Sequence, residues 1–401
     1  MAKKTVNNLA NKIKKHNKTL YYSLVAIAAI VIIVFSIWAA LNPSGLDRLF
    51  SGKTNETDTS APNVPNDVDD YYIGHTFSSL SGNIKFNPAA DLTNGLIVHF
   101  IDVGQGDAIY IEFPDGRDML IDGGSVKSSN NPLQTIDGNV IQDKNGRLLS
   151  NYIKKYNNDN VIDYLLITHT DKDHYSLLPA VFVDFDINVV YLPYVDIDLF
   201  GTSATAEEKA MFDGGLMIDT KGYVEIVKMA ISEPNCAVKC TQGNHKVSIS
   251  DEIDFNMYAL EKDDYAKYKL GKDDANELSP ICILSYAKRK IVLTGDAEIL
   301  SENDYLDESP TVNCDVLKVG HHGSASSTSV NFLNDISPEY AIISAGTHET
   351  FKHPRLSTLE KFKASQIEYF CTIDCGTIVL KVSDDGNMSF YSARNLNALV
   401  A

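Results

Sequence analysis

Residues 161–174 read VIDYLLITHTDKDH and carry the strongest signal in the chain. The apolar first half is typical of a buried strand, and two histidines and two aspartates follow it within six residues. A tight turn after a strand lets such side chains converge on one point, and imidazole and carboxylate groups are common ligands of divalent metals. The run therefore predicts a site for one or two metal ions at the end of a strand, in preference to an ordinary solvated loop.

Three other apolar runs end in the same way. Residues 120–124 read LIDGG, residues 292–296 read VLTGD, and residues 317–323 read LKVGHHG. Ligand-type residues at the ends of several strands can hold a metal pair on a rigid sheet, and glycines let backbone and substrate approach closely. We expect these four strand ends to meet at one site.

The rest of the chain interleaves strand and helix patterns. A three-stranded meander is expected at 96–103, 108–113 and 118–122, and helices at 148–156, 177–182 and 223–231. Further strands are expected at 188–193, within 236–260, and at 281–286, 290–294, 316–319 and 340–344, with a polar connection at 262–277. This alternation predicts an α/β fold.

Six motifs in order resemble the metallo-β-lactamase superfamily, and within it the ComEC-like metallohydrolases of competence-type DNA uptake. They are HFIDVGQGDA at 99–108, IDGG at 121–124, HxDxDH at 169–174, TGD at 294–296, VGHHGS at 319–324 and HP at 353–354. The resemblance spans about residues 96–382. It implies an αββα four-layer sandwich with the metal site along one edge of the two sheets.

The resemblance also implies roles for individual residues. His169 and Asp171 would hold one metal ion, Asp173 and His174 the other, and Asp296 would bridge them, with one of His321 and His322 completing a shell. Asp173, Asp107 and His353 would act at the reacting or substrate side, and Asp122 and Gln105 would support the site from behind.

The chain departs from the commoner pattern of the superfamily at two points. Asp171 stands where a third histidine is usual. A further ligand histidine is usual between the HxDxDH and TGD motifs, and His245 is the only candidate there. Asn276 and Ser279 resemble a loop-ordering Asn-x-x-Ser pair. The implied cofactors are two divalent ions, zinc or manganese, because an oxygen-rich set of ligands favours harder metals.

A metal pair of this kind activates a bound water and stabilises anionic oxygens, which suits hydrolysis. Phosphodiesters, DNA among them, are the favoured substrates, and lactones, amides and carboxylic esters are the alternative. A non-catalytic sensor or scaffold is a third interpretation, but it would be expected to have lost ligand residues.

The N-terminal sequence predicts that the hydrolase domain lies outside the cytoplasm. Residues 20–41 are uncharged and follow six lysines, which predicts a single-pass transmembrane helix after a cytoplasmic basic tail at 1–19. A cleaved signal peptide is the alternative. A disordered linker is expected at 42–70. The hydrolase domain is expected at 71–401, on the outer side of the cell membrane. The formal charge of −18 disfavours tight electrostatic binding of nucleic acid unless a local basic patch or the metals assist.

The six cysteines leave two interpretations open. Cys236 and Cys240, like Cys371 and Cys375, lie four residues apart and could form local disulfides in an exported domain. Alternatively, all six cysteines are reduced and pack as small apolar residues.

Overall fold

The computed structural model describes residues 76–79, 82–125, 132–143, 146–196, 205–216, 221–309, 312–347 and 351–395. The expected basic tail, transmembrane helix and linker all lie outside these residues. Within the described ranges, no helix is long and apolar enough to cross a membrane.

The first of two mixed sheets joins strands from both ends of the described chain. Its order is β1-β16-β15-β2-β3-β4-β5-β6-β7. The strands are β1 (Ile84–Lys85), β2 (Leu96–Phe100), β3 (Ile109–Glu112), β4 (Asp118–Ile121), β5 (Val161–Leu166), β6 (Asp186–Pro193), β7 (Ala237–Thr241), β15 (Ile378–Val382) and β16 (Met388–Ser392). The meander β2-β3-β4 is antiparallel as expected, whereas β4, β5, β6 and β7 run parallel.

The second sheet has the order β14-β13-β12-β11-β10-β9-β8. Its strands are β8 (Gly243–Ser248), β9 (Asp254–Ala259), β10 (Ile281–Tyr286), β11 (Arg289–Leu293), β12 (Val316–Lys318), β13 (Tyr340–Ile343) and β14 (Glu368–Cys371). Strands β11 to β14 are parallel. The α/β fold with two mixed sheets is thus confirmed.

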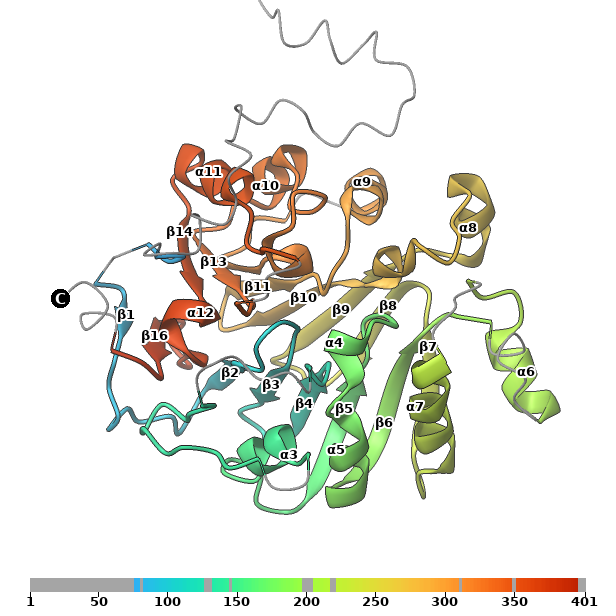
Figure 1. Cartoon of the computed structure of the whole chain (residues 1–401), viewed down its shortest axis with the longest axis horizontal. Helices are drawn as coiled ribbons and strands as arrows, with labels where there is room; N and C mark the ends of the chain where they lie inside the picture. Colours follow the sequence, from blue (N-terminus) through green and yellow to red (C-terminus); the bar gives the residue numbers. More distant parts are fainter. Residues whose placement is uncertain are drawn as a thin grey trace, which may run out of the picture. The chain divides into compact units, whose positions relative to one another are not determined.

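Helices cover the outer face of each sheet (Figure 1). On the first sheet lie α3 (Leu148–Ile153), α5 (Leu178–Asp184) and α7 (Lys221–Ser232), and on the second lie α9 (Ile299–Glu308), α10 (Val330–Ile336) and α11 (Leu356–Ala364). Shorter helical segments are α4 (Lys172–Tyr175), α6 (Ala206–Phe212), α8 (Lys262–Tyr268), α12 (Thr372–Cys375), η3 (Ala275–Leu278) and η4 (Gly320–Gly323).

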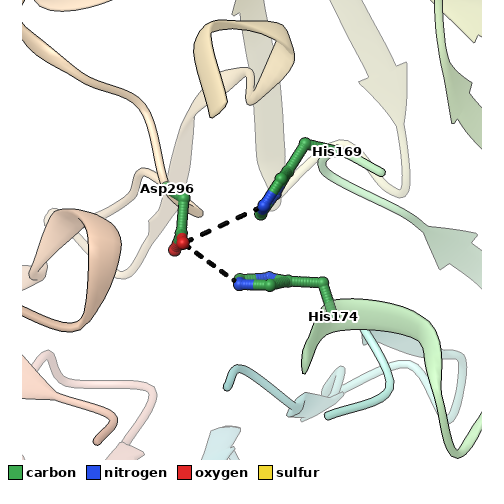
Figure 2. Close-up of side chains that lie close together, drawn as sticks. All are labelled: His169, His174 and Asp296. Carbon is green, nitrogen blue, oxygen red and sulfur yellow. Dashed lines mark ion pairs between the residues drawn. The ribbon is translucent and has the colours of Figure 1, made fainter. Parts of the chain in front are cut away.

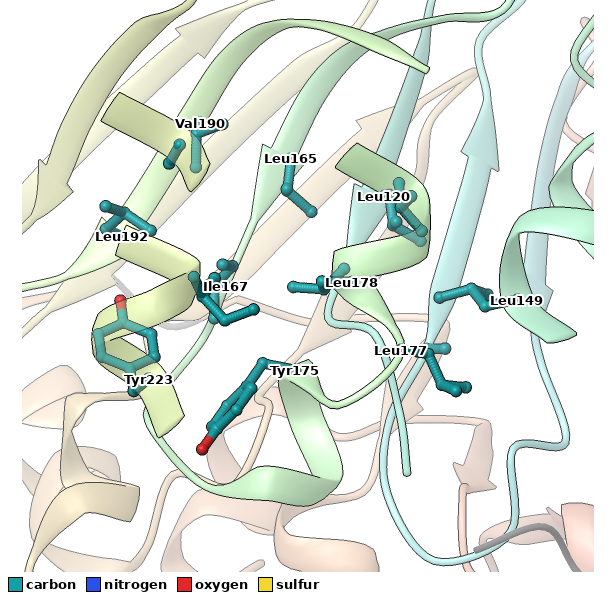
Figure 3. Close-up of a cluster of buried hydrophobic side chains, with 14 of the residues drawn as sticks. Leu120, Leu149, Leu165, Ile167, Tyr175, Leu177, Leu178, Val190, Leu192 and Tyr223 are labelled. Atoms are coloured by element: carbon teal, nitrogen blue, oxygen red, sulfur yellow. The ribbon is translucent and has the colours of Figure 1, made fainter. Parts of the chain in front are cut away.

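Three apolar layers hold these elements together. One fills the space between the sheets and includes Phe100, Phe255 and Leu284. A second packs helices on the first sheet, where Leu178 of α5 and Tyr223 of α7 lie among strand residues (Figure 3). A third lies beneath α9, α10 and α11. Each fully buried large apolar side chain contributes roughly 1.5–3 kcal/mol, so the strand ends are fixed from both faces.

Burial explains why the strands read as they do in the sequence. All five residues of β2 are buried, because a central strand covered on both faces needs a continuous apolar run. Strand β8, at a sheet edge, alternates buried and exposed residues.

The region 262–277 is not a simple polar connection. It contains α8, which begins with a capping box in which Glu261 and Asp264 satisfy each other's backbone, and η3. Tyr265 is buried and packs against the first sheet's outer layer. The polar composition hid this helix because its packing rests on a few aromatic side chains, Tyr265 and the partly buried Tyr268, and not on a continuous apolar face.

The six cysteines are free in the structure. Neither four-residue pair forms a disulfide, so the packed, reduced interpretation describes this state.

Candidate metal centre

The motif-bearing loops follow two pairs of parallel strands. Strands β4 and β5 are paired in the first sheet, and β11 and β12 in the second. Parallel neighbours bring their carboxyl ends to the same sheet edge. The loop residues after all four strands therefore meet, as the sequence predicted.

Asp296 is the centre of the cluster. Its Oδ2 atom lies 3.3 Å from Nε2 of His174 and 3.3 Å from Nε2 of His322. The Nε2 atoms of His169 and His321 each lie 3.9 Å from the same oxygen. Figure 2 shows His169 and His174 pointing at Asp296 from the β5 side. Four imidazoles from two sheets thus surround one carboxylate oxygen.

The opposite nitrogen, Nδ1, of each of these rings lies beside a hydrogen-bonding group. The nearest partners are Asp122 Oδ2 for His174 at 2.8 Å, Glu298 Oε1 for His321 at 2.9 Å, the Ser344 carbonyl for His322 at 3.0 Å, and Thr168 Oγ1 for His169 at 3.1 Å. A carboxylate or carbonyl acceptor keeps the hydrogen on Nδ1 and leaves a lone pair on Nε2. At least three rings are thus held as metal ligands require.

The aspartates of the HxDxDH motif lie on the more open side. Asp173 Oδ2 is 3.3 Å from His322 Nε2, and its side chain is 28% exposed. Asp171 Oδ2 is 4.0 Å from His169 Nε2, and its side chain is 51% exposed. His169 and His174 are fully buried behind them, so solvent reaches the cluster from the side of Asp171 and Asp173.

Asp122 fixes the side of the cluster that is formed by the loops after β4 and β5, which we call the first side; the loops after β11 and β12 form the second side. Its carboxylate accepts hydrogen bonds from the backbone nitrogen of Thr168 at 2.8 Å, from the Thr168 hydroxyl at 2.7 Å and from His174 at 2.8 Å. It is completely buried, and a buried carboxylate is tolerated only with such partners.

Asp107 lies between the two sides. Lys318 is completely buried in β12, and its Nζ lies 2.7 Å from Asp107 Oδ2. Asp107 Oδ1 is 3.4 Å from His322 Nδ1. The Oε1 atom of Gln105 accepts a hydrogen bond from the backbone nitrogen of Gly346 at 3.4 Å, which ties this turn to the loop after β13.

Gly106 allows this loop to approach the cluster. A Cβ atom added there would lie 2.1 Å from the carbonyl oxygen of Asp173, and its φ of +125° suits glycine alone.

His353 lies against the histidine pair of η4. Its ring centre is 5.2 Å from that of His321 and 6.4 Å from that of His322. Burial, reinforced by His322 and His321, lowers the pKa of His353 to about 3. It therefore contributes a neutral ring to the cluster.

His321 and His322 have left-handed backbone conformations, with φ of +47° and +55°. Histidine adopts this region more readily than most residues, but each instance still costs about 1–3 kcal/mol. Because two consecutive residues of η4 have this conformation, both imidazole rings face Asp296.

The residues fit a pair of divalent ions. His169 Nε2 and Asp296 Oδ1 are buried without a hydrogen-bond partner, which is costly unless another group satisfies them. Among the described residues, four triads have their ligand atoms within 4.8 Å of one another, and two of them contain residues of the HxDxDH motif facing the second sheet: His169, His174 and Asp296, and Asp173, His174 and His322. Burial lowers the pKa of His169 to about 4, so this ring is neutral and able to coordinate. The clusters are consistent with a dinuclear site.

The structure brings His169, Asp171, Asp173, His174, Asp296, His321 and His322 together, but it does not bring His245. That residue lies in β8, where its Nε2 accepts from the Gln242 backbone at 3.3 Å. Ser279 meets the expectation of an ordering role: its hydroxyl lies 3.3 Å from His169 Nδ1 and accepts from the Asp296 backbone at 3.2 Å.

Two residues around the cluster were not singled out from the sequence. Lys318 is a single charge in the apolar run of β12, a pattern that could have indicated a buried partner. Glu298 follows the TGD motif by two residues, where an acidic residue reads as an ordinary helix start.

Parts of known proteins are similar in sequence to this chain. ComE operon protein 3 of Bacillus subtilis is 26% identical over 308 residues, which are 73% of this chain and 34% of that protein. Competence protein ComA of Neisseria gonorrhoeae is 35% identical over 83 residues, which are 20% of this chain and 12% of that protein. This chain therefore spans about a third or less of the length of these relatives.

Among solved structures, the metallo-beta-lactamase fold protein YhfI of Bacillus subtilis superposes with a TM-score of 0.41 at 10% identity, covering 74% of this chain and 99% of that one. The profile described as the metallo-beta-lactamase superfamily matches residues 101–348. The chain belongs to the metallo-β-lactamase superfamily.

Proposed function

We propose that this chain is a metal-dependent hydrolase of phosphodiesters, with nucleic acid as the first substrate class to test. The observation that supports it is the ring of four imidazole Nε2 atoms around Asp296 Oδ2. The likeness to two relatives, one of them named a competence protein, supports nucleic acid as the class.

Two divalent ions held by the cluster would activate water near neutral pH and stabilise negative charge on phosphoryl oxygens. The chain's own residues supply the rest of the site. Asp296 would lie between the ions, because histidines from both sheets face its Oδ2. Burial opposes ionisation of this carboxylate, but the neighbouring His174, His322 and His321 together keep the pKa of Asp296 well below its usual value.

The substrate would enter from the side of Asp171 and Asp173, where the cluster is open to solvent. His353, whose neutral ring lies beside His321, would exchange a hydrogen bond with a substrate oxygen. Ser326 is not free to do so through its proton, because its hydroxyl donates to Glu298.

Zinc is the first metal to test. Both His321 and His322 face Asp296, so the set of ligands contains more imidazole than the sequence alone indicated. Imidazole suits zinc, whereas a set of mainly oxygen ligands suits manganese.

The test is hydrolysis of bis(p-nitrophenyl) phosphate, p-nitrophenyl acetate and single-stranded DNA by the purified full chain in detergent, with zinc or manganese added. We expect metal-dependent diester cleavage that is lost in Asp296→Asn and His174→Ala and retained in Asp254→Asn, an exposed strand residue. Cleavage of the carboxylic ester without either phosphodiester would move the proposal to the alternative class.

We also propose that residues 20–41 anchor the domain in the cell membrane, with residues 1–19 in the cytoplasm and residues 71–401 outside it. The uncharged run after six lysines supports this proposal. The full chain should stay in the membrane pellet after alkaline extraction, and protease added to spheroplasts should degrade the domain. Release into the alkaline supernatant would contradict the anchor.

A further inference from the structure

Three side chains from separate segments converge on one oxygen of Glu298. Its Oε1 lies 2.9 Å from His321 Nδ1, 2.9 Å from the Ser326 hydroxyl and 3.2 Å from Asn276 Nδ2. Glu298 is the residue before α9, Asn276 belongs to η3, and Ser326 lies between η4 and α10. This Glu298 clamp, defined by Glu298, Asn276 and Ser326, joins three loops around one imidazole.

The clamp determines which nitrogen of His321 faces the metal cluster. An anionic acceptor at Nδ1 keeps the hydrogen there, so Nε2 carries the lone pair. That Nε2 atom lies 3.9 Å from Asp296 Oδ2, on the far side of the ring from Glu298. The arrangement matches His174, whose Nδ1 is held by Asp122 while its Nε2 faces the same oxygen.

His321 needs such a clamp more than its neighbour does. Its side chain is 22% exposed, whereas that of His322 is 1% exposed and enclosed by packing. A partly exposed ring is held less firmly by packing than a buried one, and the nearby rings of His322 and His353 offer no charged acceptor that would select one orientation. Charge-assisted hydrogen bonds are roughly twice as strong as neutral ones, so the carboxylate is well suited to hold it.

We propose that Glu298 is a positioning residue that aims His321 at Asp296 and thereby completes the half of the centre where Asp171 replaces a third histidine. His169 supplies a buried Nε2 without a partner on that half, and His321 would supply the second imidazole. The inference rests on the proposed metal centre, not on the identity of the substrate.

The test is titration of the metal-free full chain with Co²⁺, which reports both the number of ions bound and their ligand field. Wild type should bind two equivalents. In Glu298→Gln the neutral amide is a weaker acceptor, so one equivalent should bind about 10–100-fold more weakly and with an altered ligand-field spectrum. The other equivalent, held by Asp173, His174 and His322, should bind as in wild type.

Glu302→Gln is the matched control. Glu302 lies one turn further along α9 and also binds the loop before α10, through the Ser329 backbone nitrogen at 2.8 Å, but its carboxylate is bonded to that loop and not to His321. Its two equivalents should match wild type. Equal losses in both variants would show that holding the loop, and not aiming the ring, is what matters, and would overturn the proposal.

A double-mutant cycle separates positioning from direct ligation. In a His321→Ala background, Glu298→Gln should have no further effect on Co²⁺ affinity. A further loss there, or wild-type titration in the single Glu298→Gln variant, would overturn the inference. Two equivalents in wild type without diester cleavage would instead contradict the proposed function alone.

Discussion

The two sides of the metal centre are built differently. On the first side, after β4 and β5, one contiguous motif supplies His169, Asp173 and His174, and the completely buried Asp122 holds His174. On the second side, after β11 and β12, the holding carboxylate is Glu298, which is 27% exposed. His174 is thus held by a completely buried carboxylate, whereas His321 is held by a partly exposed carboxylate that joins separate loops.

The largest expected loss of stability comes from breaking the ion pair that joins the second side to the β2–β3 loop. Lys318 from β12 and Asp107 from the β2–β3 loop form a buried ion pair. Lys318→Met should destabilise the metal-free protein by about 3–5 kcal/mol, because Asp107 would remain buried and unpaired. Urea unfolding measures this cost. Adding Asp107→Asn to Lys318→Met should recover part of the stability, and no recovery would show that the pair is not the cause.

On the first side, Asp122→Asn should weaken metal binding by about 10–100-fold, or about 1.4–2.8 kcal/mol, because the charged acceptor of His174 is lost. Isothermal titration with Zn²⁺ measures it. Asp118→Asn is the control, since it replaces a buried carboxylate at the opposite end of the same strand, where Tyr110 donates to it. Equal weakening in the two variants would argue against a specific role for Asp122.

The approach of the two loops on the first side can be tested at Gly106. Gly106→Ala should cost about 1–3 kcal/mol, because φ is +125° and the new Cβ would meet the Asp173 carbonyl oxygen. Thermal unfolding should show the loss. Gly116→Ala is the control: it also has a positive φ, but nothing lies within 4 Å of its Cβ position. A loss no larger than that of Gly116→Ala would mean that the backbone conformation alone, and not the contact, matters.

Glu302, on the second side, should make the free energy of unfolding depend on pH. Burial raises the pKa of this carboxyl from 4.5 to about 7. Between these values the folded state binds more protons than the unfolded state, so its contribution to stability is complete below pH 4.5 and is lost as pH rises through 7. Glu302→Gln should flatten the fall in unfolding free energy by up to about 1.4 kcal/mol per pH unit in this window. Parallel curves for variant and wild type would contradict the assignment.

The difference between the sides also explains what the sequence could predict. Strand β5 and its HxDxDH turn were recognisable because a largely apolar run ends abruptly in ligand residues. The meander followed from strand and turn patterns, whereas the two-sheet arrangement was implied by the family resemblance. The roles of His321 and His322 could not be separated, because they depend on two left-handed backbone positions and on which acceptor lies behind each ring.

Long-range partners were the hardest to foresee. Lys318 and Asp107 are 211 positions apart, and Glu298 reaches Asn276 and Ser326 across separate loops. Local patterns carry no information about such pairs. Helix α8 was missed for a related reason, since its packing depends on a tertiary contact of Tyr265 and not on a repeating apolar face.

The central proposal is that Asp296 helps to hold two metal ions, one together with His169 and the other together with His322. Anomalous diffraction from crystals of the zinc-loaded full chain tests it most directly. We predict two peaks flanking Asp296 Oδ2, one beside His169 and one beside His322. A single peak, no peak, or peaks that do not contact Asp296 would contradict this account.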